Sequence, residues 1–291
     1  MTNFPFVAQR MFNCPLAIHP AKAEIIVGAL ADRLGIASLR MNGELIALKA
    51  SGAWDKDDAE GDTYEEEGYQ VELGVAKIDV QGTTVMKLSS LRPFSGMTGY
   101  NGLRQNIAEA VADSRVKAIM LDIDSPGGEV SGLFDLVDFI SAANKIKPIF
   151  AVLTESAYSA GYAIASACEK IYIPRTGGAG SIGIVWMHCD FSQAIRDAGV
   201  TVTFVTRGDR KVDGAEELPL SPEALKRAQA DIDTIGSLFE QTVAQNRGLS
   251  AAKIRDMQAG TFLGAESVAN GLTDKVMAPD AAFQDILEQI G

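Results

Sequence analysis

The amino-acid sequence predicts an α/β fold in which a mostly parallel sheet is flanked by helices. Between residues 71 and 173, short apolar runs alternate with longer segments whose apolar residues recur at helical spacing. These apolar runs are continuous, as in strands that are covered on both faces. A long amphipathic segment after residue 221 adds a helical C-terminal part.

The predicted elements follow one another in a regular order. Strands are expected at residues 71–80, 118–123, 148–153 and 171–173, and helices at 101–112, 130–143 and 159–167. Two more strands, 183–187 and 201–205, are expected on either side of a helix at 191–198. Ser221 is a suitable N-cap and Pro222 suits the first helical position, so a long helix is predicted from there to Gly248.

Residues 1–68 differ from the rest of the chain. They hold one helical pattern, at 20–34, and then eight acidic residues with a single lysine between Asp55 and Glu67. Such a run repels itself and buries little apolar surface. We therefore expect an N-terminal helical arm and acidic linker over residues 1–68 and a catalytic domain over 69–291. An acidic surface loop is the alternative interpretation of the charged run.

Composition and charge argue against several classes of protein. Lys and Arg number 26 against 38 Asp and Glu, a formal net charge of −12, which does not suit a protein that grips nucleic-acid phosphates. The three cysteines are widely spaced and form no CxxC motif, which argues against a disulfide framework and against structural zinc. No signal peptide and no apolar run of about 20 residues is visible. The sequence predicts a cytoplasmic protein with no membrane anchor.

One glycine-rich stretch, residues 178–183, matches the GxGxxG pattern of dinucleotide-binding proteins. That mechanism needs a helix to begin at the glycines, whereas a strand-like run follows them here. A tight turn with close backbone packing is the favoured interpretation. No cofactor is therefore expected.

A candidate nucleophile lies between a predicted strand and a predicted helix. The run Ala157-Tyr158-Ser159-Ala160-Gly161 resembles the GxSxG nucleophile elbow, with alanine in place of the first glycine. Small neighbours allow the sharp turn that presents a serine hydroxyl where a helix begins. A plain N-cap serine is the alternative, and spacing alone favours it.

A nucleophilic serine needs a base, and the sequence offers few histidines. His188, the last of two, lies in an apolar run where a half-buried structural role is favoured. A serine without a histidine partner points to a Ser–Lys pair, because a neutral amine can accept the hydroxyl proton. Lys211 follows a predicted strand in a charged loop and is the favoured candidate base, with a solvated loop lysine as the alternative. The other lysines after the elbow are Lys170, Lys226, Lys253 and Lys275. The Gly127-Gly128 turn could supply one oxyanion-binding N–H and Ala160 the other, although the motif alone indicates only a turn.

Several ordered motifs together resemble one known family. The segments DSPGGEV, AYSAGYAIASACEKIY, GAGSIGIV, RGDRKVDG and TFLGAESVANGLTDKV occur in the order typical of the signal peptide peptidase A family of serine peptidases. The upstream segments MFNCPLAIHPAKAEIIVGALADRLGIASL and LRPFSGMTGYNGL are similar to the lambda-type phage head (capsid) maturation proteases of that family. The resemblance covers nearly the whole chain and implies a Clp-protease/crotonase-like fold.

The resemblance also implies roles for individual residues. Ser159 would be the nucleophile, Lys211 the general base, and Ser181 the residue that hydrogen-bonds and orients the lysine amine. The backbone N–H groups of Gly128 and Ala160 would bind the oxyanion. Many members have glycine where this chain has Ala160, which keeps the donor and narrows the site slightly. The resemblance also implies ring-like homo-oligomers, in which the lysine loop of one protomer completes the site of its neighbour. It implies no metal and no cofactor.

The predicted function is that of a serine endopeptidase which processes phage or prophage head proteins, namely capsid, scaffold or portal proteins, in the host cytoplasm or the prohead interior. Alternatives are a signal peptide peptidase-like enzyme acting on membrane-derived peptides, a crotonase-like acyl-CoA enzyme, and a non-enzymatic scaffold or shell protein. The sequence leaves open the cleavage site, the protomer number and self-cleavage. Phage members are typically followed by a scaffold region, and the sequence stops at Gly291 without one.

Overall fold

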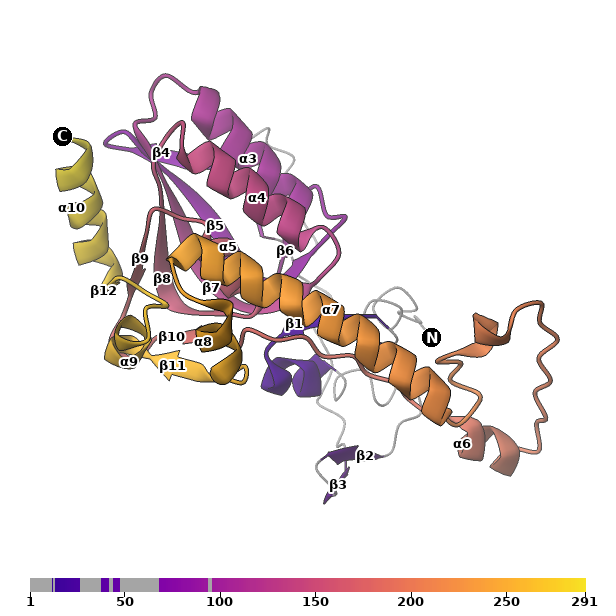
Figure 1. Cartoon of the computed structure of the whole chain (residues 1–291). Coiled ribbons are helices and arrows are strands. Elements are labelled where there is room, and N and C mark those ends of the chain that lie inside the picture. The colour runs from indigo at the N-terminus through magenta and orange to yellow at the C-terminus, as the bar shows by residue number, and fades with distance from the viewer. Residues whose placement is uncertain (1–11, 13, 27–37, 42–43, 48–67, 94–95) are drawn as a thin grey trace.

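A ten-stranded mixed sheet forms the centre of the molecule (Figure 1). The computed structural model describes residues 12, 14–26, 38–41, 44–47, 68–93 and 96–291. The strands of the sheet are β1 (Leu16–Ile18), β4 (Gln70–Glu72), β5 (Val75–Val85), β6 (Met97–Gly99), β7 (Ala118–Glu129), β8 (Ile149–Tyr158), β9 (Lys170–Ile173), β10 (Gly178–Gly180), β11 (Thr261–Leu263) and β12 (Lys275–Val276). A separate pair, β2 (Ser38–Met41) and β3 (Glu44–Ala47), is antiparallel.

The strand order β11-β10-β8-β7-β5-β4 makes the sheet mostly parallel. The pairs β5–β7, β7–β8, β8–β9 and β8–β10 are parallel. Antiparallel pairing occurs where β4 meets β5, where β1 meets β7 and where β10 meets β11. The predicted α/β class, a mostly parallel sheet with flanking helices, is confirmed.

Helices cover both faces of this sheet. The larger core lies on one face, where α3 (Tyr100–Ala112), α4 (Leu133–Asn144), α5 (Ala160–Ser166) and part of α7 (Pro222–Arg247) pack against it. The smaller core lies on the opposite face under α10 (Pro279–Ile290). Along β7, Ile119 and Leu121 belong to the larger core while Met120 belongs to the smaller one. A strand sends successive side chains to opposite faces, which explains its continuous apolar run.

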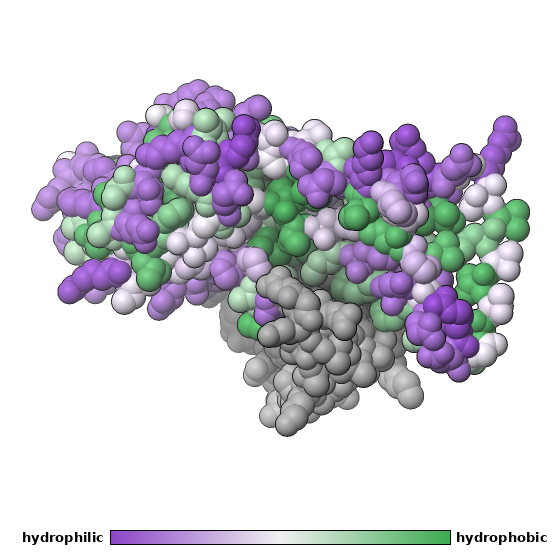
Figure 2. All heavy atoms as spheres, turned by 60° about the horizontal axis from the view of Figure 1, so that its bottom comes forward, coloured by the Kyte–Doolittle hydropathy of each residue, from purple (hydrophilic) through white to green (hydrophobic). Residues whose placement is uncertain are grey.

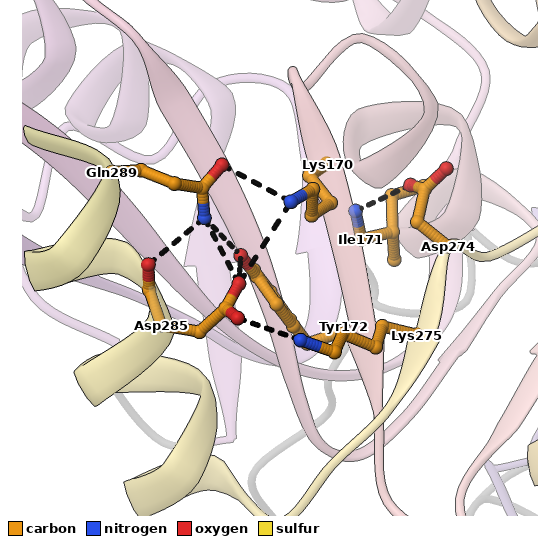
Figure 3. Close-up of polar contacts among 7 residues, drawn as sticks. All are labelled: Lys170, Ile171, Tyr172, Asp274, Lys275, Asp285 and Gln289. Atoms are coloured by element: carbon orange, nitrogen blue, oxygen red, sulfur yellow. Dashed lines mark hydrogen bonds and ion pairs between the residues drawn. The ribbon is translucent and has the colours of Figure 1, made fainter.

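The C-terminal helix is held by polar contacts as well as by its apolar face (Figure 3). Asp285 accepts a hydrogen bond from the hydroxyl of Tyr172 at 2.6 Å and pairs with the Lys275 ammonium at 2.6 Å. Gln289 donates to the same tyrosine hydroxyl at 2.8 Å. Burial raises the pKa of Tyr172, and the hydrogen bond from Lys275 lowers the pKa of Asp285. These contacts join α10 to β9 across more than 100 residues of sequence.

Several predicted boundaries need correction. The strand expected at 71–80 is a hairpin, because Leu73 and Gly74 both have positive φ (50° and 84°) and separate β4 from β5. The turn expected at Gly127-Gly128 is instead in the last part of β7, which pairs with β5 there. Residues 183–187 form no named strand, and only Val185 makes an isolated bridge, with Leu16. Residues 201–205 have no regular structure and are exposed.

Other predictions hold. The long helix α7 begins at Pro222, and the Ser221 hydroxyl accepts a hydrogen bond from the N–H of Ala224 at 3.1 Å. Gly248 ends this helix at φ 64°. Residues 20–26 are helical, whereas the rest of the helix predicted at 20–34 and the acidic linker lie outside the described residues. In the part of the chain that is described, no helix is long and apolar enough to cross a membrane.

One segment projects away from the sheet (Figure 1). It contains α6 (Ser192–Asp197) and a 3-10 turn (Asp209–Val212), and it leads into the N-terminal half of α7, which extends away from the sheet with it. We call residues 190–220 the arm; it is distinct from the N-terminal helical arm predicted within residues 1–68. Residues 199–211 of the arm are all exposed.

Candidate active site

Ser159 lies at the junction between β8 and α5. Its backbone adopts φ 51° and ψ −115°, a conformation that is rare for a residue with a side chain. The N–H of Ser159 donates to the carbonyl oxygen of Gly180 at 2.8 Å, and its carbonyl accepts from the N–H of Ala163 at 2.9 Å. The predicted sharp strand-to-helix turn is therefore present, and no side-chain capping bond forms at this helix start.

Small residues let the neighbouring backbone approach this turn. A Cβ atom at Gly161 would lie 2.9 Å from Cβ of Ser125. A Cβ at Gly127, where φ is 103°, would lie 3.0 Å from Cβ of Ser159 and 2.2 Å from the carbonyl oxygen of Ala17. Contacts below 3.0 Å are not tolerated, so glycine is required where β7 passes Ser159.

The segment after β10 runs along the other side of Ser159. Gly180 lies opposite Tyr158 in the parallel β8–β10 pair, and Ser181 follows it at φ 54° with its N–H donating to Gly260 at 2.9 Å. The Ser159 hydroxyl donates to the carbonyl oxygen of Gly183 at 3.4 Å. No helix begins at these glycines, and a Cβ at Gly178 would lie 1.9 Å from the Tyr158 hydroxyl. Close packing accounts for the GxGxxG match.

The structure brings four of the five predicted site residues into one region. Ser159 caps α5 and Ala160 begins it, Ser181 follows β10, and Gly128 lies in β7 one residue beyond Gly127, where a Cβ would approach Cβ of Ser159. All four are in the interior: Ser159 has no exposed surface and Ser181 is 5% exposed. Gly128 lies opposite Ala17 of β1 in the antiparallel ladder.

Lys211 is the exception. It lies in the 3-10 turn of the arm and is exposed. Among the described residues, no hydrogen bond or ion pair joins its ammonium group to Ser159 or Ser181. Its loop is fixed instead by Asp213, which accepts bonds of 2.6 and 2.8 Å from the Arg227 guanidinium of α7. Within one chain, the candidate base and the candidate nucleophile do not meet.

Two cysteines and the second histidine of the chain lie apart from the predicted site residues in their chemistry, because their thiols are protonated and the ring is stacked. Burial raises the pKa of the Cys168 thiol, and burial raises that of Cys189 to about 11, so both stay protonated at neutral pH. The His188 ring is half-buried and stacks on Trp186, with ring centroids 5.9 Å apart. In the described part of the chain, no cluster of His, Cys, Asp and Glu could hold a metal ion. The half-buried placement expected for His188 agrees with this position.

The strand β1 also lies at this site and is not among the elements predicted from the sequence. Leu16–Ile18 pairs with Gly127–Glu129, and the ring of the following residue, His19, lies 4.9 Å from the ring of Tyr158. The run Pro15-Leu16-Ala17-Ile18-His19-Pro20 carries the available signal, since a short apolar run between two prolines suits an edge strand. A depression of about 460 Å³ lies at the Glu129 end of this pairing, lined partly by Cys14, Pro15 and Met86.

Comparison with known proteins supplies the family. The model of peptidase family S49 matches residues 141–290, slightly more than half of the chain and including β8, α5 and the arm. The chain belongs to peptidase family S49. This matches the family resemblance inferred from its motifs.

Similar curated proteins include two from phages. The chain is 35% identical over 280 residues to capsid assembly protease C of Escherichia phage lambda, a match that covers 95% of this chain and 64% of that protein. It is 36% identical over 286 residues to head-tail preconnector protein GP5 of Enterobacteria phage P21, covering 96% of this chain and 56% of that protein. The chain thus spans less than two thirds of the length of these two relatives.

More distant similarities extend beyond phages. A chloroplastic serine protease SPPA of Arabidopsis thaliana is 27% identical over 176 residues, covering 60% of this chain and 26% of that protein. Among solved structures, an enoyl-CoA hydratase/isomerase family member matches with a TM-score of 0.42 and 15% identity, covering 76% of this chain and 74% of that one.

Proposed function

We propose that this chain is a serine endopeptidase that uses a dyad of Ser159 and Lys211 to process phage or prophage head proteins. The observation that carries the proposal is the strained turn at Ser159, which is packed between the glycines of β7 and the segment after β10. Strained backbone conformations concentrate at functional sites because the surrounding structure has to enforce them. A serine that served only as a helix cap would need neither this conformation nor glycines on both sides.

In the proposed mechanism, the neutral Lys211 amine accepts the Ser159 proton as Oγ attacks the scissile carbonyl carbon. The resulting oxyanion accepts hydrogen bonds from the N–H groups of Gly128 and Ala160. The lysine then returns the proton to the leaving amine, and water releases the acyl group in a second step. Ser181 orients the amine toward Ser159.

Lys211 is proposed to reach Ser159 of a neighbouring protomer. Three features support this: the arm projects from the sheet, Lys211 is exposed, and several apolar side chains of the arm are exposed. Val200, Val202 and Phe204 are 52%, 38% and 41% exposed, and Val205 is 96% exposed. Figure 2 shows hydrophobic residues along the arm at the right of the view. Contiguous exposed apolar side chains are typical of an interface.

Complementation tests this arrangement directly. Ser159→Ala and Lys211→Ala proteins are each expected to be inactive, and a mixture allowed to exchange subunits is expected to recover part of the activity. Recovery should rise with protein concentration, because the site would exist only in the oligomer. If subunits demonstrably exchange and no activity returns, the dyad does not form between protomers.

The substrate class rests on the phage relatives, whose names describe capsid assembly and a head-tail preconnector. The test is incubation of the wild-type protein and Ser159→Ala with purified capsid, scaffold and portal proteins, read by mass spectrometry. Cleavage by the wild type alone supports the proposal. Cleavage by both proteins would remove Ser159 from the mechanism, and cleavage of signal peptides alone would favour the signal peptide peptidase alternative. Turnover of an acyl-CoA thioester that survives Ser159→Ala would favour the crotonase-like alternative.

A further inference from the structure

We propose that β1 occupies the peptide-binding groove of this same chain and keeps Ser159 covered until the strand is displaced. The inference rests on the proposed function of Ser159 and adds a regulatory step to it. The segment concerned is Leu16–Ile18, which is buried along its whole length.

The backbone of β1 is paired along both of its edges. On one side it runs antiparallel to Gly127–Glu129 of β7, and the N–H of His19 donates to the carbonyl oxygen of Pro126 at 2.7 Å. On the other side, Leu16 and Val185 exchange two hydrogen bonds of 2.9 Å. An extended peptide bound by strand addition would use the same backbone groups on both walls.

β1 lies close to Ser159, so its pairing blocks access to the serine hydroxyl. The point where a Gly127 Cβ would lie is 2.2 Å from the Ala17 carbonyl oxygen and 3.0 Å from Cβ of Ser159. Ser159 has no exposed surface, and its hydroxyl bonds Gly183, two residues before the Val185 wall. A substrate carbonyl cannot reach this hydroxyl by the groove between β7 and Val185 while β1 fills it.

The apolar contacts of β1 make it separable from the rest of the fold. Leu16 and Ile18 belong to a small cluster with Phe12 and Ala23, against which Val185 packs, and only Ala17 belongs to the main core. The strand has three residues, whereas β7 pairs with β5 and β8 along most of its length. Displacement of β1 would therefore leave the main sheet intact.

A reversible crosslink tests the proposal in the full chain. Leu16→Cys and Val185→Cys are combined with Cys14→Ser and Cys189→Ser, so that no other half-buried thiol competes. The mutual hydrogen bonds of residues 16 and 185 identify a hydrogen-bonded pair, with Cα atoms about 5.5 Å apart, a separation that a disulfide spans. Disulfide formation is verified by mass spectrometry, and Ser159 is then labelled with a fluorophosphonate probe before and after reduction.

The expected result is labelling and peptide hydrolysis at least about 10-fold slower in the oxidised protein than in the same sample after reduction. Recovery on reduction excludes misfolding, and the two single-cysteine variants should show no redox effect. If the oxidised and reduced proteins are labelled and hydrolyse peptides at equal rates, β1 does not cover the site, and Ser159 can still be the nucleophile. A reduced protein that hydrolyses peptides without labelling at Ser159 would overturn the proposed nucleophile, and the covering role of β1 with it.

Weakening the strand gives an independent measurement. Leu16→Ala removes buried contacts of β1 and is expected to raise the labelling rate several-fold. Ile286→Ala removes a buried side chain of α10 on the opposite face of the sheet and serves as the matched control. An unchanged labelling rate in Leu16→Ala, or an equal rise in both variants, would contradict the proposal.

Discussion

Replacing Ser159 with glycine is expected to give a more stable protein than replacing it with alanine. Both variants lack the hydroxyl, so the difference between them isolates the cost of placing a Cβ atom at this turn. The backbone at Ser159 has φ 51° and ψ −115°, a region that glycine adopts freely and other residues adopt under strain. The comparison measures the strain stored at the candidate nucleophile.

The magnitude follows from two opposing effects. A residue with a side chain in such a conformation costs about 1–3 kcal/mol. Glycine loses about 0.4–1 kcal/mol through the greater freedom of its unfolded chain. The free energy of unfolding of Ser159→Gly should therefore exceed that of Ser159→Ala by about 1–2 kcal/mol.

The assay is urea unfolding followed by circular dichroism, with the midpoint and slope fitted for each variant. Ala160→Gly is the matched control, because residue 160 begins α5 and glycine in a helix is destabilising by about 0.5–1 kcal/mol. Glycine should therefore be more stable than alanine at position 159 and less stable than alanine at position 160. A Ser159→Gly protein no more stable than Ser159→Ala would refute the strain argument.

Three further predictions concern the base, its orienting residue and the C-terminal helix. Lys211→Arg should fold and be inactive, since a guanidinium does not give up its proton at working pH; peptide hydrolysis within tenfold of wild type would exclude Lys211 as base. Ser181→Ala should lower kcat more than it raises KM in steady-state kinetics, because alignment rather than binding is lost, and an unchanged kcat would leave Ser181 as a turn residue. Asp285→Asn should cost about 1 kcal/mol at pH 7 through weaker contacts to Tyr172 and Lys275. The Asp285 pKa is lowered in the fold, so this contribution is present above the unfolded value near 4 and is lost as the pH falls below it; a cost that stays constant from pH 7 to pH 3 would contradict the assignment.

Much of the sheet could be predicted because its strands are buried on both faces. Continuous apolar runs located β7, β8 and β9, and the N-cap signal at Ser221 located the start of α7. The failures have tertiary causes. The end of β7 contains Pro126 and two glycines, yet it remains a strand because β5 and β1 pair with it.

In the arm, by contrast, a strand was predicted where none forms. Residues 201–205 have the composition of a strand, and no other strand of the described chain pairs with them. Apolar content indicates that a segment can be buried, whereas a strand also needs a neighbour with free backbone groups. The sequence therefore predicted a strand where the structure has exposed apolar side chains.

The residues of the candidate site also fall into two groups, those positioned by local turns and those positioned by contacts between distant segments. Ser159, Ser181 and Gly127 each have positive φ, and short motifs of small residues specify such turns locally. The turns at Ser159 and Ser181 could be placed from the sequence, whereas Gly127, expected in a turn, lies in the strand β7. These residues lie near one another because β8 has β10 as its parallel neighbour on one side and β7 on the other. Lys211 and β1 depend instead on how distant segments pack: the lysine projects on the arm, while β1 lies between β7 and Val185. In the proposed enzyme, the residues set by local turns form the nucleophilic half of the site, and both the base and the access of substrate are set by contacts that can be made and broken.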